Sequence, residues 1–292
     1  MQLEILGSGT SHGIPVISCD CKTCTSKDKK DKRLRCSALL KDEPDTNILI
    51  DAGPEFRLQA LRSGIKKLDA VFLTHSHADH LHGIDDLRVF ACTRSKDDPK
   101  KSDPYPLKIY ANKETIDDFK YRFAYLFIPV LQGGGLAFID LIDTGTFSKE
   151  NPIDINGIKI VPVPIMHGNL PVNGYVFQKN NSPKKQTIAY LTDCNYIPES
   201  SIELINSFGK IDVLVIDGLR EKPHSTHFSF FEAAEVAEKI GAEKTYFTHL
   251  CHNTTHKGTV KWIKENLKNF PTLSKIVKTG GLFAPAYDGL KI

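Results

Sequence analysis

A short segment with four metal-ligating side chains constrains the fold of this chain more than any other feature. Residues 69–84 read DAVFLTHSHADHLHGI, an apolar run followed within six residues by His75, His77, Asp79 and His80. Alternate side chains point the same way in extended backbone, so the first two histidines can converge on one cation while the aspartate and the third histidine turn to a second. Imidazole and carboxylate ligands suit zinc, manganese or iron. A polar surface loop would explain one such histidine, but four ligating residues at this spacing predict a metal centre.

The same residue types recur singly after three later strand-like runs. His167 ends IKIVPVPIMH, Asp193 ends TIAYLTD and His249 ends KTYFTH. This recurrence favours metal ligation over a solvated loop. We therefore predict that these three residues join the four of the dense motif in one two-metal centre.

Strand-length apolar runs, loops with His or Asp, and helical patterns alternate along the chain without an internal repeat. Strands are predicted at residues 2–6, 37–40, 47–51, 70–74, 108–110, 159–163, 174–178, 187–192, 213–217 and 245–248. Helices are predicted at residues 54–63, 85–92, 113–127, 229–240 and 259–267. Residues 93–106 and 131–135 are expected to be loops. Because neither loop separates two plausible cores, we predict a single hydrolase domain over residues 1–292.

Composition and charge narrow the class of protein. The chain has 38 lysines and arginines against 35 acidic residues, which is too balanced to indicate a nucleic-acid-binding surface by charge alone. The N-terminus, MQLEILGSGT, lacks the pattern of a secretory signal. No apolar run approaches the ~18 to 20 residues of a membrane span, and pairing all seven cysteines would leave one over. These features favour a cytoplasmic protein.

A second metal signal lies near the N-terminus. The motif C-x-C-x-x-C is formed by Cys19, Cys21 and Cys24, and His252 follows much later, three residues beyond His249. Three thiolates and one imidazole would complete a closed tetrahedral zinc site, which is structural because no position remains for water. Cys251 competes with His252 as the fourth ligand, and free buried cysteines or a redox pair are the alternatives.

The dense motif identifies a family resemblance. HSHADH resembles the HxHxDH signature of the metallo-β-lactamase superfamily, and the three later residues match its remaining ligands in order. The resemblance implies an α/β (α+β) fold, a four-layer αββα sandwich with the site at one edge. It also implies that one metal is held by His75, His77 and His167, the other by Asp79, His80 and His249, and that both are bridged by Asp193. Asp51, in NILIDAG, resembles the carboxylate that supports a ligand imidazole in this family, with a strand-ending turn as the alternative.

The group of Cys19, Cys21, Cys24 and His252, called the clip below, resembles together with the predicted ligands the phosphoribosyl cyclic phosphodiesterase family of bacterial phosphonate breakdown. That resemblance implies hydrolysis of small cyclic phosphodiesters, with two divalent ions, zinc or manganese, at the active site and one structural zinc. Two neighbouring cations can activate a bridging water as hydroxide for an in-line displacement. Asp79 is expected to serve this chemistry as well as ligation.

A proton donor for the leaving oxygen is expected in the segment PHSTHFS. His227 matches, by its position upstream of His249, the acid histidine of the phosphodiesterase family. Histidine suits the task because its unperturbed pKa is near 6.5. His224 is the alternative donor.

Other functions share parts of this pattern. A pyrroloquinoline quinone biosynthesis protein has a similar clip and layout and would make the chain an oxidative catalyst. A tRNA-maturation nuclease should carry a long RNA-gripping insertion, and we find none. A thioester hydrolase or lactamase would not need the acid histidine, and a non-catalytic protein should have a degenerate metal shell. The expected partner is a small phosphodiester, with nucleic acid as a lesser alternative, no membrane, and a homodimer left open.

Overall fold

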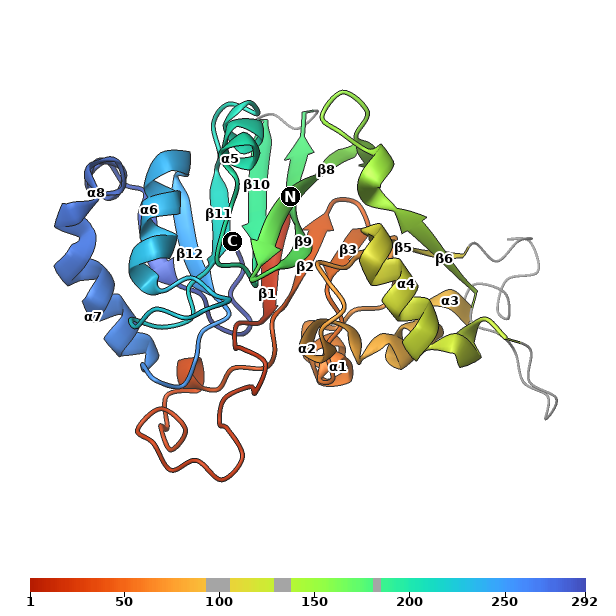
Figure 1. Cartoon of the computed structure of the whole chain (residues 1–292), viewed down its shortest axis with the longest axis horizontal. Helices are drawn as coiled ribbons and strands as arrows, with labels where there is room; N and C mark the ends of the chain where they lie inside the picture. Colours follow the sequence, from red (N-terminus) through yellow and green to blue (C-terminus); the bar gives the residue numbers. More distant parts are fainter. Residues whose placement is uncertain (93–105, 129–137, 181–184) are drawn as a thin grey trace.

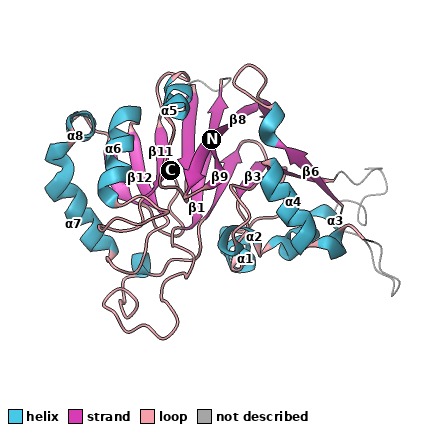
Figure 2. Ribbon diagram, viewed as in Figure 1, coloured by secondary structure: helices cyan, strands magenta, loops and turns pink. Residues whose placement is uncertain are grey.

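The structure, a computed structural model, describes residues 1–92, 106–128, 138–180 and 185–292. The loop predicted at 131–135 lies outside these residues, as does the loop at 93–106 except for its last residue. Within the described residues, the strands form two sheets that pack face to face between two groups of helices (Figure 1). Figure 2 shows this layering, with strands in the middle of the molecule and helices on both sides.

The first sheet, formed early in the chain, has the strand order β1-β2-β3-β4-β5-β6. Its strands are β1 (Gln2–Gly7), β2 (Ser37–Asp42), β3 (Thr46–Ile50), β4 (Ala70–Phe72), β5 (Leu107–Ala111) and β6 (Ile139–Asp143). β1, β2 and β3 are antiparallel neighbours, whereas β3 to β6 are parallel. Because β3 and β4 run the same way, the segments that follow them leave the sheet at the same edge.

The second sheet has the strand order β13-β12-β11-β10-β9-β8-β7. Its strands are β7 (Ile153–Ile155), β8 (Ile158–His167), β9 (Leu170–Lys179), β10 (Gln186–Leu191), β11 (Val213–Asp217), β12 (Lys244–Thr248) and β13 (Leu282–Pro285). β10 to β13 are parallel, and β9 is antiparallel to both β8 and β10. β8, β10, β11 and β12 therefore run in one direction, and their carboxyl ends share one edge.

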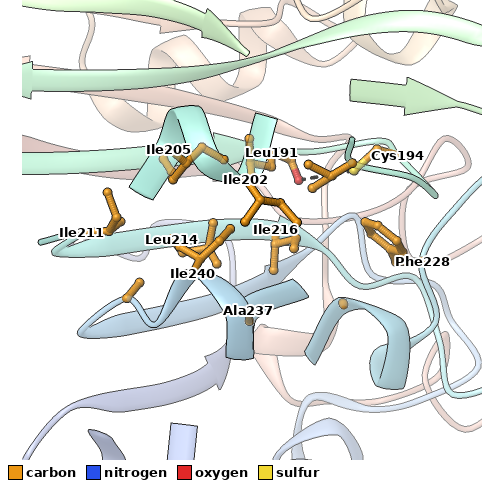
Figure 3. Close-up of a cluster of buried hydrophobic side chains, with 14 of the residues drawn as sticks. Leu191, Cys194, Ile202, Ile205, Ile211, Leu214, Ile216, Phe228, Ala237 and Ile240 are labelled. Atoms are coloured by element: carbon orange, nitrogen blue, oxygen red, sulfur yellow. Dashed lines mark hydrogen bonds between the residues drawn. The ribbon is translucent and has the colours of Figure 1, made fainter. Parts of the chain in front are cut away.

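Three apolar layers hold the sandwich together. The middle layer lies between the sheets and contains Phe72, Tyr175 and Phe177. The outer layers pack each sheet against helices, which are α1 (Phe56–Ser63), α2 (Ala78–Leu81), α3 (Arg88–Cys92) and α4 (Lys113–Arg122) for the first sheet and α5 (Glu199–Asn206), α6 (Phe230–Ile240), α7 (His256–Asn266) and α8 (Pro271–Lys278) for the second. Figure 3 shows isoleucines of α5 and α6 meeting Leu214 and Ile216 of β11. The predicted αββα sandwich is confirmed.

Helix α6 forms where the sequence predicts it because its ends are strongly encoded. Ser229 accepts a hydrogen bond from the backbone of Glu232, whose carboxylate accepts one from Ser229 in return, and this capping box starts the helix. Gly241 ends the helix in the left-handed region, at φ 65°. The apolar face is buried against β11 and β12.

Several elements differ from the prediction. The helix expected over 113–127 ends at Arg122 and is followed by a separate short turn at Ala124–Leu126. The strands β6, β7 and β13 were not predicted, because they are short edge strands without the fully apolar pattern of a central strand. The helices α5 and α8 were not predicted either. No described helix is both long and apolar enough to cross a membrane.

Candidate functional site

The parallel strand ends bring the predicted ligands to one place. His167 is the last residue of β8, Asp193 follows β10 by two residues, and His249 follows β12 directly. His75 and His77 lie between β4 and α2. The last two residues of the dense motif, Asp79 and His80, belong to α2, because the chain turns into a helix after His77. This short helix was not among the predicted elements.

Three groups of possible ligand atoms share Asp193, and within each group these atoms lie within 4.8 Å of one another. Two of them, here called the ligand groups, contain only predicted ligands: Asp79, His80, Asp193 and His249 in one, and His75, His77 and Asp193 in the other. The third joins Asp193 and His249 to Asp217 and His227. His167 belongs to none of these groups at that distance. Its Nδ1 lies 3.2 Å from Asp193 Oδ1 and 2.7 Å from the carbonyl oxygen of Thr226, so it carries a proton and leaves Nε2 free.

Unpartnered buried atoms indicate, independently of the sequence motif, that these residues are suited to bind divalent cations. The buried atoms without a suitable hydrogen-bond partner include five on the predicted ligands: His75 Nε2, Asp79 Oδ2, His80 Nε2, Asp193 Oδ1 and His249 Nε2. A buried polar atom without a partner costs about 1–3 kcal/mol. Ligation would remove that cost, and these nitrogen and oxygen donors suit zinc or manganese.

Asp51 makes the hydrogen bond expected of a supporting carboxylate. It is fully buried, and its Oδ2 accepts from His80 Nδ1 at 2.7 Å and from the hydroxyl of Thr74 at 2.9 Å. Its Oδ1 accepts from the backbone N–H of Thr74 at 2.8 Å. The bond to Nδ1 fixes the tautomer of His80 and directs Nε2 toward the ligand group.

The buried charges of the site compensate one another. Burial by itself would lower the pKa of His80, but the carboxylates of Asp79 and Asp51 hold that pKa well above its usual value. Burial would likewise raise the pKa of Asp193, but His249 and His75 hold it well below its usual value. Burial lowers the pKa of His167 to about 4, so its imidazole is neutral and able to ligate near neutral pH.

Backbone strain is concentrated at the site. Asp51, Asp193 and His249 adopt φ values of 59°, 57° and 56°, in the left-handed region that non-glycine residues rarely occupy. Each follows a strand, and each costs of order 1–3 kcal/mol. The surrounding structure holds these turns, which bring Asp193 and His249 into one ligand group and Asp51 onto Nδ1 of His80.

A functional candidate that the sequence analysis missed is Asp217, the last residue of β11. Its side chain is fully buried, and Oδ2 accepts from His227 Nδ1 at 3.0 Å and from the backbone N–H of Cys194 at 3.1 Å. Burial raises the pKa of Asp217 well above its usual value, although the charge of His249 opposes the shift. The sequence did contain a sign of this residue: the strand-like run VLVID ends in an aspartate, as does TIAYLTD, from which Asp193 was predicted.

His227 lies against the ligand groups. Its ring is 4.7 Å from those of His249 and His167, and its Nδ1 is 3.1 Å from Asp193 Oδ1. Burial lowers the pKa of His227, with Asp193 opposing the shift. Because Nδ1 faces Asp217 and Asp193, Nε2 is the nitrogen left to meet a substrate.

The N-terminal clip residues meet as predicted from their types. The Sγ atoms of Cys19, Cys21 and Cys24 lie 3.3, 3.6 and 3.6 Å from Nδ1 of His252. Cys251 is not in this group, and its carbonyl oxygen accepts from Arg33 Nη1 at 2.9 Å. The backbone N–H of Cys24 lowers the pKa of Cys21 to about 6, which favours the thiolate form that binds metal.

A close backbone contact fixes the helix that carries two ligand candidates. A Cβ at Gly53 would lie 2.0 Å from the carbonyl oxygen of Asp79. We expect Gly53→Ala to displace α2 and to lower the free energy of unfolding by about 1–3 kcal/mol. The metal content should fall as well, because α2 carries Asp79 and His80. Gly145→Ala, where the nearest atom is a side-chain oxygen 3.3 Å away, is the matched control. Chemical denaturation and metal analysis measure both effects, and an unchanged Gly53→Ala protein would contradict the expectation.

Comparisons with known proteins identify a family model and a similar solved structure. The Beta-lactamase superfamily domain matches residues 46–250. The chain is 36% identical to a new diphosphatase from the PhnP family, whose crystal structure superposes with a TM-score of 0.77 over 100% of this chain and 96% of that one.

Two curated relatives are longer than the matched region. The octanoyltransferase of Porphyromonas gingivalis is 35% identical over 254 residues, which are 87% of this chain and 46% of that protein. Ribonuclease Z of Bradyrhizobium diazoefficiens is 32% identical over 143 residues, which are 48% of this chain and 43% of that protein. The matches thus span less than half the length of either relative.

Proposed function

Because the chain belongs to the metallo-β-lactamase superfamily and has its hydrolase fold, we propose that it is a phosphodiesterase that cleaves small, cyclic phosphodiesters at a two-metal centre. The observation that carries this proposal is the Asp217–His227 pair beside the ligand groups, with Nδ1 of the histidine 3.0 Å from the carboxylate. Hydrolysis of a phosphodiester needs a proton donor for the leaving oxygen. A lactam or thioester hydrolase has less need of this pair.

The metal ligands are assigned as the family resemblance implies. One cation would be held by His75, His77 and His167 and the other by Asp79, His80 and His249, with Asp193 as a ligand available to both. Zinc or manganese bound there would supply Lewis-acid stabilisation of phosphoryl oxygens and a water nucleophile at neutral pH. Asp79, 7% exposed, has one buried oxygen without a partner and serves as ligand and catalytic residue.

The protein's own residues handle the proton. Asp217 accepts the hydrogen bond of Nδ1 and so keeps the His227 ring in one orientation. The acid is the cationic form of His227, which carries a proton on each ring nitrogen: it gives the proton on Nε2 to the leaving oxygen as the P–O bond breaks and keeps the Nδ1 proton that bonds to Asp217. Its ring stacks on His249 at 18° between planes, which holds this nitrogen next to the reacting group.

A second candidate substrate class is the diphosphates. It is favoured by the 36% identity to a diphosphatase over the whole chain. A diphosphate offers the same phosphorus electrophile and the same need for a stabilised leaving oxygen. The ribonuclease and quinone-cofactor alternatives, like the cytoplasmic location and the possible homodimer, stay predictions.

Turnover measurements on metal-analysed protein test the proposal. The panel contains bis(p-nitrophenyl) phosphate, ribose and nucleoside cyclic phosphates, a dinucleoside diphosphate, an octanoyl thioester and a β-lactam. The thioester is included because one relative is an octanoyltransferase. Turnover selective for phosphodiesters supports the proposal. Failure on every phosphodiester and diphosphate with a full metal complement overturns it.

We also propose that the clip of Cys19, Cys21, Cys24 and His252 holds a structural zinc. It would join the loop between β1 and β2, the red loop at the bottom of Figure 1, to the segment after His249. Cys21→Ser should remove one zinc per chain and lower the thermal midpoint, because closed zinc sites contribute directly to folding. Cys36→Ser, at a buried cysteine outside the clip, is the control for metal content. Full zinc in the Cys21→Ser protein would reject the clip.

A further inference from the structure

An exposed histidine extends the row of imidazoles at the site. The rings of His77 and His167 lie 5.0 Å apart, those of His167 and His227 4.7 Å apart, and those of His227 and His224 5.0 Å apart. His224 contacts His227 but no ligand ring among the described residues. It therefore adjoins the proposed proton donor without belonging to either ligand group.

The loop that carries His224 is held in a defined shape although it is exposed. Arg220 donates from Nε to the carbonyl of Lys222 at 3.2 Å and from Nη2 to that of Pro223 at 3.1 Å. Nδ2 of Asn195 donates to the carbonyl of Ser225 at 3.0 Å. Since the Thr226 carbonyl is bonded to His167, carbonyls on both sides of His224 are fixed by side chains from other positions.

The hydrogen bonds of His224 determine which of its nitrogens is the donor. Its Nδ1 accepts from the backbone N–H of Thr226 at 3.3 Å, so the proton of the neutral ring is on Nε2. Burial and the neighbouring His227 and Arg220 lower the pKa of His224, which keeps the ring neutral near pH 7. His224 Nε2–H is therefore a hydrogen-bond donor already in place beside His227, near the permanently charged guanidinium of Arg220.

We propose that His224 is a specificity-determining residue that donates from Nε2 to an oxyanion on the leaving group, so that substrates whose leaving group is itself a phosphate ester are preferred. The inference rests on the proposed function. In the proposed function the reacting phosphorus binds at the metal ligands and His227 protonates the leaving oxygen. The rest of the leaving group, beyond that oxygen, would then lie next to His224. In such a substrate, water forms the new P–O bond, the P–O bond to the leaving group breaks, and the departing phosphomonoester takes the proton.

Two substrates separate this inference from the proposed function. In a dinucleoside diphosphate the leaving group is a nucleoside monophosphate, whereas in bis(p-nitrophenyl) phosphate it carries no phosphate. For the metal-loaded enzyme we expect a higher kcat/KM on the diphosphate. His224→Ala should lower that kcat/KM about 10- to 100-fold, the size of one hydrogen bond to a charged group, and change that of bis(p-nitrophenyl) phosphate less than about threefold.

Matched variants and a binding measurement distinguish substrate contact from loop structure. His224→Gln keeps a donor near the Nε2 position and should recover most of the loss, whereas His224→Phe keeps only the ring and should not. Lys222→Gln, an exposed change in the same loop, is the control. Calorimetry should show the Kd for the product nucleoside monophosphate rising about tenfold in His224→Ala.

The outcomes are distinct. Equal losses on both substrates in His224→Ala, or a wild-type enzyme that prefers bis(p-nitrophenyl) phosphate, would overturn the leaving-group contact and leave the phosphodiesterase proposal standing. Inactivity of the wild-type enzyme on both would overturn the proposed function itself. Recovery by His224→Phe would show that the ring acts only by packing, which also overturns the inference.

Discussion

Replacing His227 with alanine is expected to lower kcat for phosphodiester hydrolysis by about 10²- to 10⁴-fold, the usual contribution of a general acid. The ring lies beside the ligand groups without being assigned to either cation, and its Nδ1 bonds to buried Asp217. Metal content should therefore stay close to that of the wild-type protein. Steady-state kinetics together with metal analysis of the same preparation measure both quantities.

The dependence on leaving group distinguishes a proton donor from a merely structural residue. Alkoxide leaving groups need protonation far more than p-nitrophenolate does, so the loss in His227→Ala should be much larger for alkyl or ribosyl esters. Asp217→Asn should show the same trend in weaker form, because it disturbs the orientation of the donor and leaves the donor in place. His82→Ala, at an exposed histidine on the C-terminal side of α2, is the control. A loss that is uniform across leaving groups would contradict the assigned role.

The residues that meet at the candidate site could be selected from the sequence because each is a ligating type and most of them follow a strand. His75, His167, Asp193 and His249 each follow a strand-like run, and parallel strands deliver such residues to one edge whatever the details of packing. The sequence could not decide whether His252 or Cys251 joins the three cysteines. Both residues are ligating types, and which of two adjacent side chains points toward the cysteines depends on the local backbone conformation. The structure separates them, since Arg33 holds the Cys251 carbonyl while the His252 ring meets the three thiols.

Asp217 shows the limit of reading a site from the sequence. As an isolated residue, an aspartate at the end of VLVID is consistent with an ordinary turn. Its importance comes from being fully buried opposite His227, which is a tertiary contact between a strand end and a loop ten residues later. The turn of Asp79 and His80 into α2 was missed for a similar reason. In the fold Gly53 lies against the Asp79 carbonyl, and the pattern of ligands alone does not reveal that contact.

The largest effect is expected from Asp193→Asn. Asp193 is 1% exposed and is the residue that both ligand groups share; its Oδ2 lies 2.9 Å from His80 Nε2 and 3.2 Å from His75 Nε2. Asparagine keeps the shape but removes the charge, so both cations should bind weakly. Because a bound cation contributes several kcal/mol to transition-state stabilisation, kcat/KM should fall by more than about 10³-fold.

A metal titration of thermal stability tests this expectation without relying on activity. In the wild-type protein, stripping the metal with a chelator should lower the thermal midpoint, and restoring it to about 100 times its Kd should add about 2.7 kcal/mol of stability. The Asp193→Asn midpoint should respond less than the wild-type midpoint over the same range, keeping only the part that comes from the zinc of the clip, whereas Asp45→Asn, at a side chain 67% exposed, should respond as the wild type does. An Asp193→Asn protein with a full metal complement and a wild-type titration would show that Asp193 does not join the two ligand groups. In that case the short distances around its carboxylate would reflect charge compensation among buried histidines, and the assignment of a shared ligand would have to be abandoned.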